Sequence, residues 1–213
     1  MSSSPRLIVV ANGKGGVGKT TTAMALSGIL SEQYKVLAVD SDRQGSLSWW
    51  VQRGGENISF DLTQETNPAL LSKLRKIEGY DWIVVDTPPA LRSEALSAVV
   101  ALADYVILPT PPAPMDLAAL IETVRLAIAP LNKAHRVLLT RVDSRSLKEA
   151  KAAQNTLREV GVPAFQAFIR TYKAHQRAAL EGIPINQCFG DNVREAKADY
   201  CRIADELESY WRN

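Results

Sequence analysis

One stretch near the start of the chain constrains the fold more than any other. An apolar run, RLIVVA, leads directly into NGKGGVGKTTT (12–22). The pattern Gly13-x4-Gly18-Lys19-Thr20 is the complete phosphate-binding loop motif, which a chain of about 200 residues of average composition matches by chance on the order of 1% of the time. Glycines let the backbone turn its N–H groups inward, and a helix N-terminus adds unpaired donors. The stretch therefore predicts a strand, an anion-binding loop and a helix, in that order.

Short apolar runs alternate with segments of helical periodicity along the whole chain. The expected strands are 6–11, 35–40, 58–62, 81–86, 105–110, 136–142 and 163–169. The expected helices are 20–33, 66–78, 92–103, 116–131, 146–160, 171–181 and 191–212. Most of the strand runs are continuously apolar rather than alternating, which is typical of strands covered on both faces. The order predicts an α/β fold, a doubly wound and mainly parallel sheet with helices on both faces, formed by residues 1–213 as a single domain.

The glycine-rich loop is suited to a nucleoside triphosphate. Lys19 is expected to reach the β- and γ-phosphates, and the Thr20 hydroxyl to ligate Mg²⁺. The expected nucleotide-binding residues are Gly13, Lys14, Gly15, Gly16, Val17, Gly18, Lys19, Thr20 and Thr21. The alternative, a glycine-rich turn with solvated lysines, leaves the position of the loop between a strand and a helix unexplained.

Two further apolar runs, KVLAVDSD and DWIVVDTPP, end in aspartates. In an open parallel sheet ligands lie beyond the carboxyl ends of the strands, and a carboxylate there is costly unless a cation or donor meets it. Asp86 is therefore expected to hold Mg²⁺ directly or through water. Asp40 and Asp42 are two residues apart and project to the same side of an extended chain. We expect Asp40 to support the water shell of the metal and Asp42 to orient the attacking water, although either could instead cap a helix near 46–53.

An additional lysine, Lys14, and the segments around it resemble a known family. GKGGVGKTTT is similar to the deviant Walker A motif KGGxGKT, VDSDRQGS to the switch motif D-x-D-P-Q-G-S, and VVDTPP to the Walker B segment. Together they resemble the ParA/MinD group of P-loop ATPases, particularly short ParA-type partition and positioning proteins without an N-terminal helix-turn-helix domain. The resemblance covers nearly the whole chain. Only the resemblance implies ATP rather than GTP, because the base pocket has no sequence signature.

The resemblance implies that Lys14 reaches across a nucleotide-sandwich homodimer to the phosphates of the other subunit. A cation inserted in trans offsets the repulsion between two facing MgATP groups and stabilises charge in the transition state. Catalytic roles are thus expected for Lys14, Lys19 and Asp42, in an ATPase that is weak without a partner. Two points stay open. Arg43 replaces the usual proline of the family, and Asp116, in PTPPAPMD, either lies near the dimer interface or only begins a helix.

The basic charge of the chain is concentrated in one region. Residues 141–177 contain eight Lys and Arg against three acidic residues, whereas the whole chain has a net charge of +2. No aromatic residues interleave these cations on a recognisable reading helix, so we expect phosphate contacts with DNA without sequence preference. The expected DNA-binding residues are Arg145, Lys148, Lys151, Arg158, Arg170, Lys173 and Arg177. A surface helix that is merely solvated by its lysines is the alternative.

These features favour a DNA-associated ATPase that is cytoplasmic and bound to the nucleoid. An ATP-dependent homodimer would bind DNA, and a ParB-like or adaptor protein on the cargo would stimulate hydrolysis, segregating plasmid or chromosomal DNA. A protein cargo, such as a carboxysome or a chemotaxis cluster, is the alternative. A membrane-cycling MinD-like regulator is disfavoured because anionic lipid repels the acidic residues of 191–212. Iron–sulfur enzymes of the superfamily need paired cluster cysteines, which the two cysteines of this chain do not supply.

Overall fold

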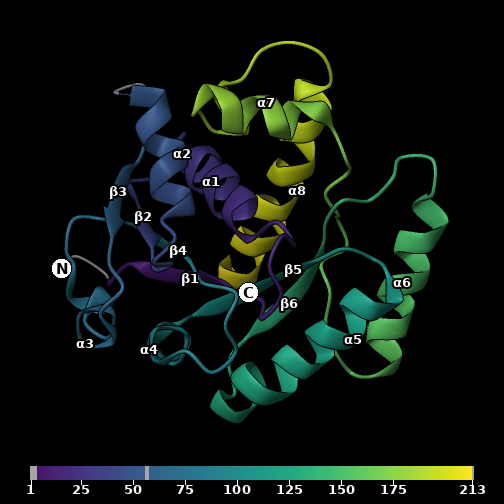
Figure 1. Cartoon of the computed structure of the whole chain (residues 1–213), viewed down its shortest axis with the longest axis horizontal. Helices are drawn as coiled ribbons and strands as arrows, with labels where there is room; N and C mark the ends of the chain where they lie inside the picture. The colour runs from purple at the N-terminus through teal and green to yellow at the C-terminus, as the bar shows by residue number, and fades with distance from the viewer. Residues whose placement is uncertain (1–3, 56–57, 213) are drawn as a thin grey trace.

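The computed structural model describes residues 4–55 and 58–212. Six strands form one parallel sheet in the order β3-β2-β4-β1-β5-β6 (Figure 1). They are β1 (Arg6–Val10), β2 (Val36–Asp40), β3 (Asp61–Gln64), β4 (Trp82–Asp86), β5 (Tyr105–Thr110) and β6 (His135–Leu139). The expected α/β fold with a parallel sheet is confirmed.

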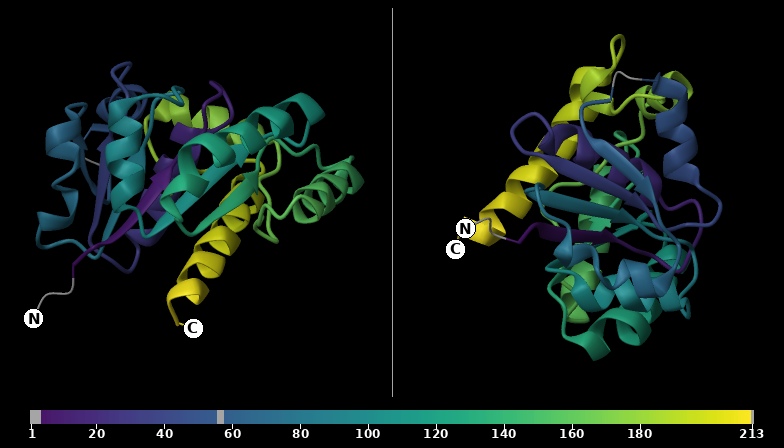
Figure 2. Two further views of the ribbon diagram at one scale, coloured as in Figure 1. Left: turned by 90° about the horizontal axis from the view of Figure 1, so that it is seen from below. Right: turned by 90° about the vertical axis from the view of Figure 1, so that its left-hand side faces the viewer.

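Helices cover both faces of this sheet (Figure 2). The α-helices are α1 (Lys19–Leu30), α2 (Ser46–Gly54), α3 (Pro68–Leu71), α4 (Glu94–Leu102), α5 (Pro114–Thr123), α6 (Leu147–Glu159), α7 (Lys173–Glu181) and α8 (Val193–Arg212). Short irregular helices are η2 (Leu74–Lys76), η3 (Val124–Ile128), η4 (Ala129–Leu131) and η5 (Ile185–Gln187). Residues of α1, α2, α7 and α8 share one apolar core, and residues of α3 to α6 share the other.

The continuous apolar runs of the strands follow from these two cores. In β1, Ile8 and Val10 pack into the core under α1, whereas Leu7 and Val9 pack into the core on the opposite face. All four side chains are fully buried. Because alternate residues of a strand point to opposite faces, a strand covered on both sides has no position left for a polar side chain.

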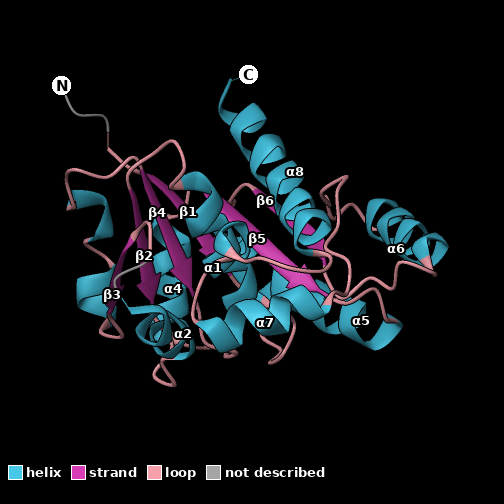
Figure 3. Ribbon diagram, turned by 90° about the horizontal axis from the view of Figure 1, so that it is seen from above, coloured by secondary structure: helices cyan, strands magenta, loops and turns pink. Residues whose placement is uncertain are grey.

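The carboxyl ends of the central strands meet at one edge of the sheet, toward which the strand arrows of Figure 3 point. Asp86, the last residue of β4, is in register with Val10 of β1 and with Asp40 of β2. Ser41 ties two of these ends together, because its backbone N–H and its hydroxyl both donate to the carbonyl of Asp86, at 2.9 and 2.7 Å. The loops that follow β1, β2 and β4 therefore converge.

The expected seventh strand, 163–169, is wrong as a continuous element. The segment runs beside β6 but forms only two isolated bridges, Val137 with Ala164 and Val142 with Arg170. Between the bridges, the carboxylate of Glu206 on α8 accepts the backbone N–H groups of residues 166 and 167, at 3.0 and 2.8 Å. These two donors are therefore lost to the sheet ladder, and a tertiary contact overrides the local β-propensity.

Three other boundaries differ from expectation. β3 lies at Asp61–Gln64 rather than 58–62, because its hydrogen bonds to β2 pair Leu37 with Asp61 and Asp40 with Gln64. The predicted helix 66–78 is broken into α3 and η2, and 116–131 begins earlier, at Pro114, and ends in the irregular helices η3 and η4. Among the described residues, no helix combines the length and the apolar character that crossing a bilayer requires.

Candidate nucleotide site

The phosphate loop joins β1 to α1 at the edge where the strand ends converge. Gly16 and Gly18 have φ angles of 72° and 98°, in the left-handed region that side chains other than glycine rarely adopt. Helix α1 starts at Lys19 with Gly18 as its N-cap, and no side chain caps it. Its first backbone N–H groups are consequently available to an anion.

Lys19 sits inside this loop, as the sequence predicts. The residue is only 7% exposed, and its Nζ donates to the carbonyl of Lys14 at 3.0 Å. Burial lowers the pKa of this amine, while the negative charges of Asp86 and Asp42 oppose the shift. Lys19 therefore interacts electrostatically with both aspartates. A triphosphate in this position would supply the anion that the buried ammonium lacks.

The pair formed by Thr20 and Asp86 fits a divalent metal. The hydroxyl of Thr20 donates to Oδ2 of Asp86 at 2.7 Å, while Oδ1 of Asp86 is buried without a hydrogen-bond partner among the described residues. Burial raises the pKa of Asp86 to about 7, against the opposing effect of the Thr20 hydrogen bond. A hydroxyl beside an unsatisfied carboxylate oxygen is a hard oxygen donor set, which suits Mg²⁺.

Asp40 makes different contacts from those expected. Its Oδ2 accepts the backbone N–H of Ser48 at 2.8 Å, and its Oδ1 accepts that of Asp42 at 3.2 Å. Asp40 thus caps the first turn of α2, which is the alternative that the sequence left open. Each oxygen of Asp40 thus accepts a backbone N–H, whereas Thr20 and Asp86 have the contacts that favour direct binding of a metal.

Asp42 lies on the loop between β2 and α2 and faces the phosphate loop. Together with Gln44 and Trp49 it lines a cavity of about 660 Å³, which is also lined by phosphate-loop residues 15, 16 and 18–21. Asp42 also borders a second cavity, of about 430 Å³, which contains Arg43. Arg43, the residue in place of the family proline, therefore faces this neighbouring cavity.

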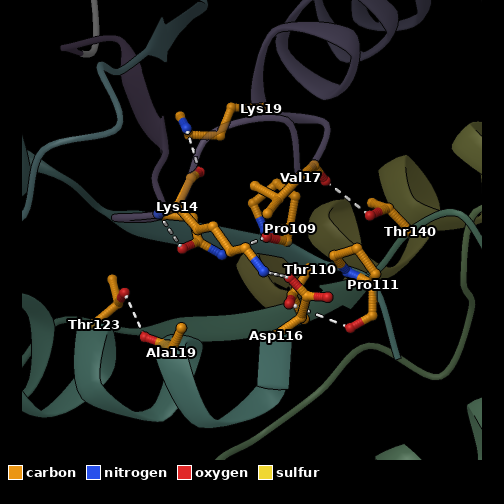
Figure 4. A network of polar contacts seen from close by, with 11 residues as sticks. Lys14, Val17, Lys19, Pro109, Thr110, Pro111, Asp116, Ala119, Thr123 and Thr140 are labelled. Carbon is orange, nitrogen blue, oxygen red and sulfur yellow. Dashed lines mark hydrogen bonds and ion pairs between the residues drawn. The ribbon is translucent and has the colours of Figure 1, made fainter. Parts of the chain in front are cut away.

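Lys14 is held within its own chain by Asp116 on the first turn of α5 (Figure 4). The lysine side chain is 46% exposed and the aspartate side chain 16% exposed, so the pair lies at the surface of the loop. Asp116 accordingly belongs to the site as well as to the start of a helix. The sequence offers no local signal for this pair, because the two residues are 102 positions apart.

Three further side chains support the backbone of the loop, and sequence reasoning missed all of them. Asn12 donates to the carbonyl of Pro109 at 2.8 Å and accepts the N–H of Lys14 at 2.9 Å. Thr123 accepts the N–H of Gly13 at 3.4 Å. Thr140 donates to the carbonyl of Val17 at 2.8 Å (Figure 4). Thr123 is the last residue of α5 and Thr140 follows β6, so both are far from the loop in sequence.

The predicted DNA-binding cations lie on or next to two helices, α6 and α7. Four lie on α6 or on the loop leading into it, and all are exposed: Arg145, Lys148, Lys151 and Arg158. The other three lie in α7 or just before it, and α7 is a separate helix from α6 in Figures 1 and 3: Arg170, Lys173 and Arg177. Arg170 forms a bridge with Val142, at the start of the loop that leads into α6, so it lies between the two groups.

Several of these cations already have partners. Arg170 forms an ion pair with the fully buried carboxylate of Asp199, at 2.7 Å, and Arg177 donates to the carbonyl of Phe189 at 2.8 Å. Arg145 pairs with Asp143, which lowers the pKa of that carboxyl to about 2. Arg170 has a structural role, because a buried carboxylate left without its cation is strongly destabilising.

A phosphate loop, a threonine–aspartate pair and a parallel sheet with helices on both faces define a P-loop nucleotide-binding protein. Residues 8–185 match the model of the CobQ/CobB/MinD/ParA nucleotide binding domain. The chain belongs to this family, and it is an ATPase. The resemblance inferred from the motifs is thereby confirmed.

Similar proteins from two bacteria align with nearly the whole chain. It is 63% identical over 211 residues to the maintenance of carboxysome distribution protein A of Gloeobacter kilaueensis, covering 99% of this chain and 98% of the relative. The protein of the same name from Halothiobacillus neapolitanus is 30% identical, with coverage of 94% and 95%. The structure of the septum site-determining protein MinD complexed with Mg-ADP, from Pyrococcus horikoshii OT3, superposes with a TM-score of 0.77 at 25% identity, covering 96% of this chain and 97% of that one.

Proposed function

We propose that this ATPase positions carboxysomes, with ATP and Mg²⁺ controlling its assembly on DNA. The observation that supports this cargo above others is the 63% identity, along nearly the full length of both chains, to a carboxysome distribution protein. Segregation of plasmid or chromosomal DNA, the cargo favoured by sequence reasoning, becomes the second candidate. The exposed basic surface of α6 is compatible with both, because each requires non-specific DNA binding.

Nucleotide binding follows from the contacts of the phosphate loop. Gly15 to Thr21 surround the phosphates with backbone N–H groups, and Lys19 exchanges its bond to the carbonyl of Lys14 for a phosphate oxygen. Thr20 and Asp86 would hold Mg²⁺, which would neutralise charge on the phosphates. Asp42, across the cavity, orients the attacking water.

Dimerisation requires Lys14 to leave Asp116. In the single chain the ammonium is satisfied by this carboxylate. In the nucleotide-sandwich homodimer it reaches the phosphates of the other subunit, which offer a greater negative charge than one carboxylate. Exposed ion pairs contribute only about 0–1 kcal/mol, so the pair with Asp116 is readily given up.

The assembled dimer then binds DNA through α6. Doubling the number of phosphate contacts steepens the dependence on salt and makes DNA binding conditional on ATP. An adaptor protein on the cargo stimulates hydrolysis and releases the dimer. The protein is accordingly cytoplasmic and nucleoid-associated, without a membrane partner.

Deletion of the gene in its host, with carboxysomes and plasmids followed in the same cells, tests the cargo. Carboxysomes that cluster while plasmids and chromosomes are inherited normally support the proposal. Plasmid loss with evenly spaced carboxysomes would favour the second candidate. Complementation with Asp42→Ala separates the requirement for dimerisation on DNA from the requirement for ATP hydrolysis. This variant is expected to form dimers on DNA but not to release the cargo.

A further inference from the structure

Thr140 is a buried residue whose hydroxyl contacts the phosphate loop. It follows directly on β6, is only 3% exposed, and donates from Oγ1 to the carbonyl of Val17 at 2.8 Å (Figure 4). Its own backbone N–H donates to the carbonyl of Thr110 at 2.8 Å. The ends of β5 and β6 thus fix the backbone of Thr140, and its side chain extends to the phosphate loop.

This hydrogen bond decides the orientation of one peptide of the loop. The carbonyl of Val17 and the N–H of Gly18 belong to one planar unit and point in opposite directions. With the carbonyl held against Thr140, the N–H of Gly18 is directed to the other side of the peptide. Gly18 has a φ of 98°, and glycine moves between left- and right-handed conformations at little cost, so the peptide needs an external restraint.

The chain around Thr140 is itself constrained. The next residue, Arg141, has a φ of 54°, which is uncommon for a residue with a side chain, and it lines the phosphate-loop cavity. A Cβ placed on Gly18 would lie 3.6 Å from Cγ2 of Thr140, so the methyl group packs beneath the loop while the hydroxyl bonds to it. Uncommon backbone conformations persist where the surroundings over-determine them, and they are frequent at functional sites.

We propose that Thr140 is a positioning residue of the ATPase, which holds the Val17–Gly18 peptide in the orientation that binds phosphate. Thr140 does not line the phosphate-loop cavity, so it acts through the carbonyl of Val17. Without its hydroxyl the peptide can turn, and the carbonyl of Val17 then presents a negative dipole where an N–H donor is needed. The free loop would be distributed over both orientations, and nucleotide affinity would fall by the fraction that is incompetent.

The substitution Thr140→Val removes the hydroxyl and keeps the branched shape, whereas Thr140→Ser keeps the hydroxyl and removes the methyl group. Thr156→Val, at an exposed position of α6, is the matched control. For Thr140→Val we expect the Kd for both ATP and ADP in Mg²⁺ to rise about tenfold, the scale of one lost hydrogen bond, with a smaller effect on kcat. Thr140→Ser is expected to stay within about threefold of the wild type.

The pair of variants distinguishes positioning from packing. If Ser weakens nucleotide binding as much as Val, the methyl contact matters and the proposal is wrong. An unchanged Kd in Thr140→Val also overturns it. Should Thr140→Val fail to fold, Thr140→Ala replaces it, and thermal unfolding of the nucleotide-free variants checks that the loss of affinity is not a loss of folded protein. A structure of the Val or Ala variant with the Val17 carbonyl unmoved would likewise contradict the assignment.

Discussion

The phosphate loop and helix α6 are both rich in cations, yet they hold them in opposite ways. Lys19 is buried and bonded to a backbone carbonyl, and Lys14 is paired with Asp116. On α6, Lys148 and Lys151 are exposed, and α6 buries only Ala150, Ala153 and Leu157. One region fixes each charge through specific contacts, whereas the other presents charge on flexible side chains.

The difference reflects what each region binds. A triphosphate in a loop has one geometry, and hydrogen bonds in a buried site are strong only when donors are correctly placed. A DNA backbone offers closely spaced phosphates that counterion release lets a protein bind without fixed geometry. The loop should therefore be sensitive to single substitutions, and α6 should respond roughly in proportion to the charge removed.

Removal of the buried loop cation should have the largest effect. Lys19→Ala is expected to weaken binding of MgATP roughly 100-fold, the upper range for hydrogen bonds to a charged group. Isothermal titration calorimetry measures the affinity, with Lys148→Ala as the control of equal charge. Comparable affinities for the two variants would contradict the distinction between the regions.

Lys14→Ala should abolish dimerisation in ATP while a large part of the nucleotide affinity remains, because the lysine acts on the phosphates of the other subunit. Light scattering of the variant with and without ATP measures the mass. A variant that still doubles its mass in ATP would show that the lysine is not needed in trans.

The raised pKa of Asp86 makes stability depend on pH in the nucleotide-free protein. With a pKa of about 7 in the folded state against 3.8 in the unfolded state, the folded protein binds an additional proton between these values. The protonated Asp86 contributes its full stabilisation below about pH 4, and this stabilisation is lost as the pH rises to about 7. Between these values the folding equilibrium constant should fall about tenfold per pH unit.

Urea denaturation of wild type and Asp86→Asn across this pH range isolates the effect of the carboxyl. The difference between the two proteins should follow the predicted slope, because other carboxyl groups contribute equally to both. A constant difference from pH 4 to pH 7 would mean that Asp86 is ionised in the free protein.

The surface of α6 should show a graded response. Lys148→Ala with Lys151→Ala is expected to lower the slope of log K against log salt by about two for DNA binding of one subunit. The control removes Lys73 and Lys76, which are equally exposed but lie near α3, at the opposite end of the sheet. Equal slopes for the two double variants would indicate that only net charge matters.

Asp116→Ala should have the smallest effect. Freed from its carboxylate, Lys14 is available to the other subunit. Because each dimer gives up two such pairs, at about 0.5 kcal/mol each, the dimer should form in ATP at a concentration about fivefold lower. Analytical ultracentrifugation across a dilution series measures this shift. Asp104→Ala is unsuitable as a control, because Asp104 forms an ion pair with Arg75. Glu122→Ala, an exposed position on α5, is the better comparison. A weaker dimer in Asp116→Ala would assign the aspartate a role in assembly.

Sequence reasoning was most successful where function depends on neighbouring residues. The loop 13–20 is a local device, because glycine conformations and the start of a helix suffice to make an anion site. At Asp40 the sequence left two roles open, and the contacts with the backbone at the start of α2 come only from the structure. Sequence reasoning was less successful at 163–169, where Glu206 takes the donors that a strand would have used.

By itself the sequence determined the parallel α/β class, the phosphate loop and the strand-ending Asp86, since strand burial, glycine conformations and the order of elements are encoded over short distances. Only the tertiary structure decided which side chains hold that loop in place. Thr140 lies 123 positions from Val17, and Asp116 lies 102 positions from Lys14. Such pairs form because β5 and β6 lie beside β1 in the sheet. No periodicity or motif in a single sequence predicts which of these distant residues come into contact.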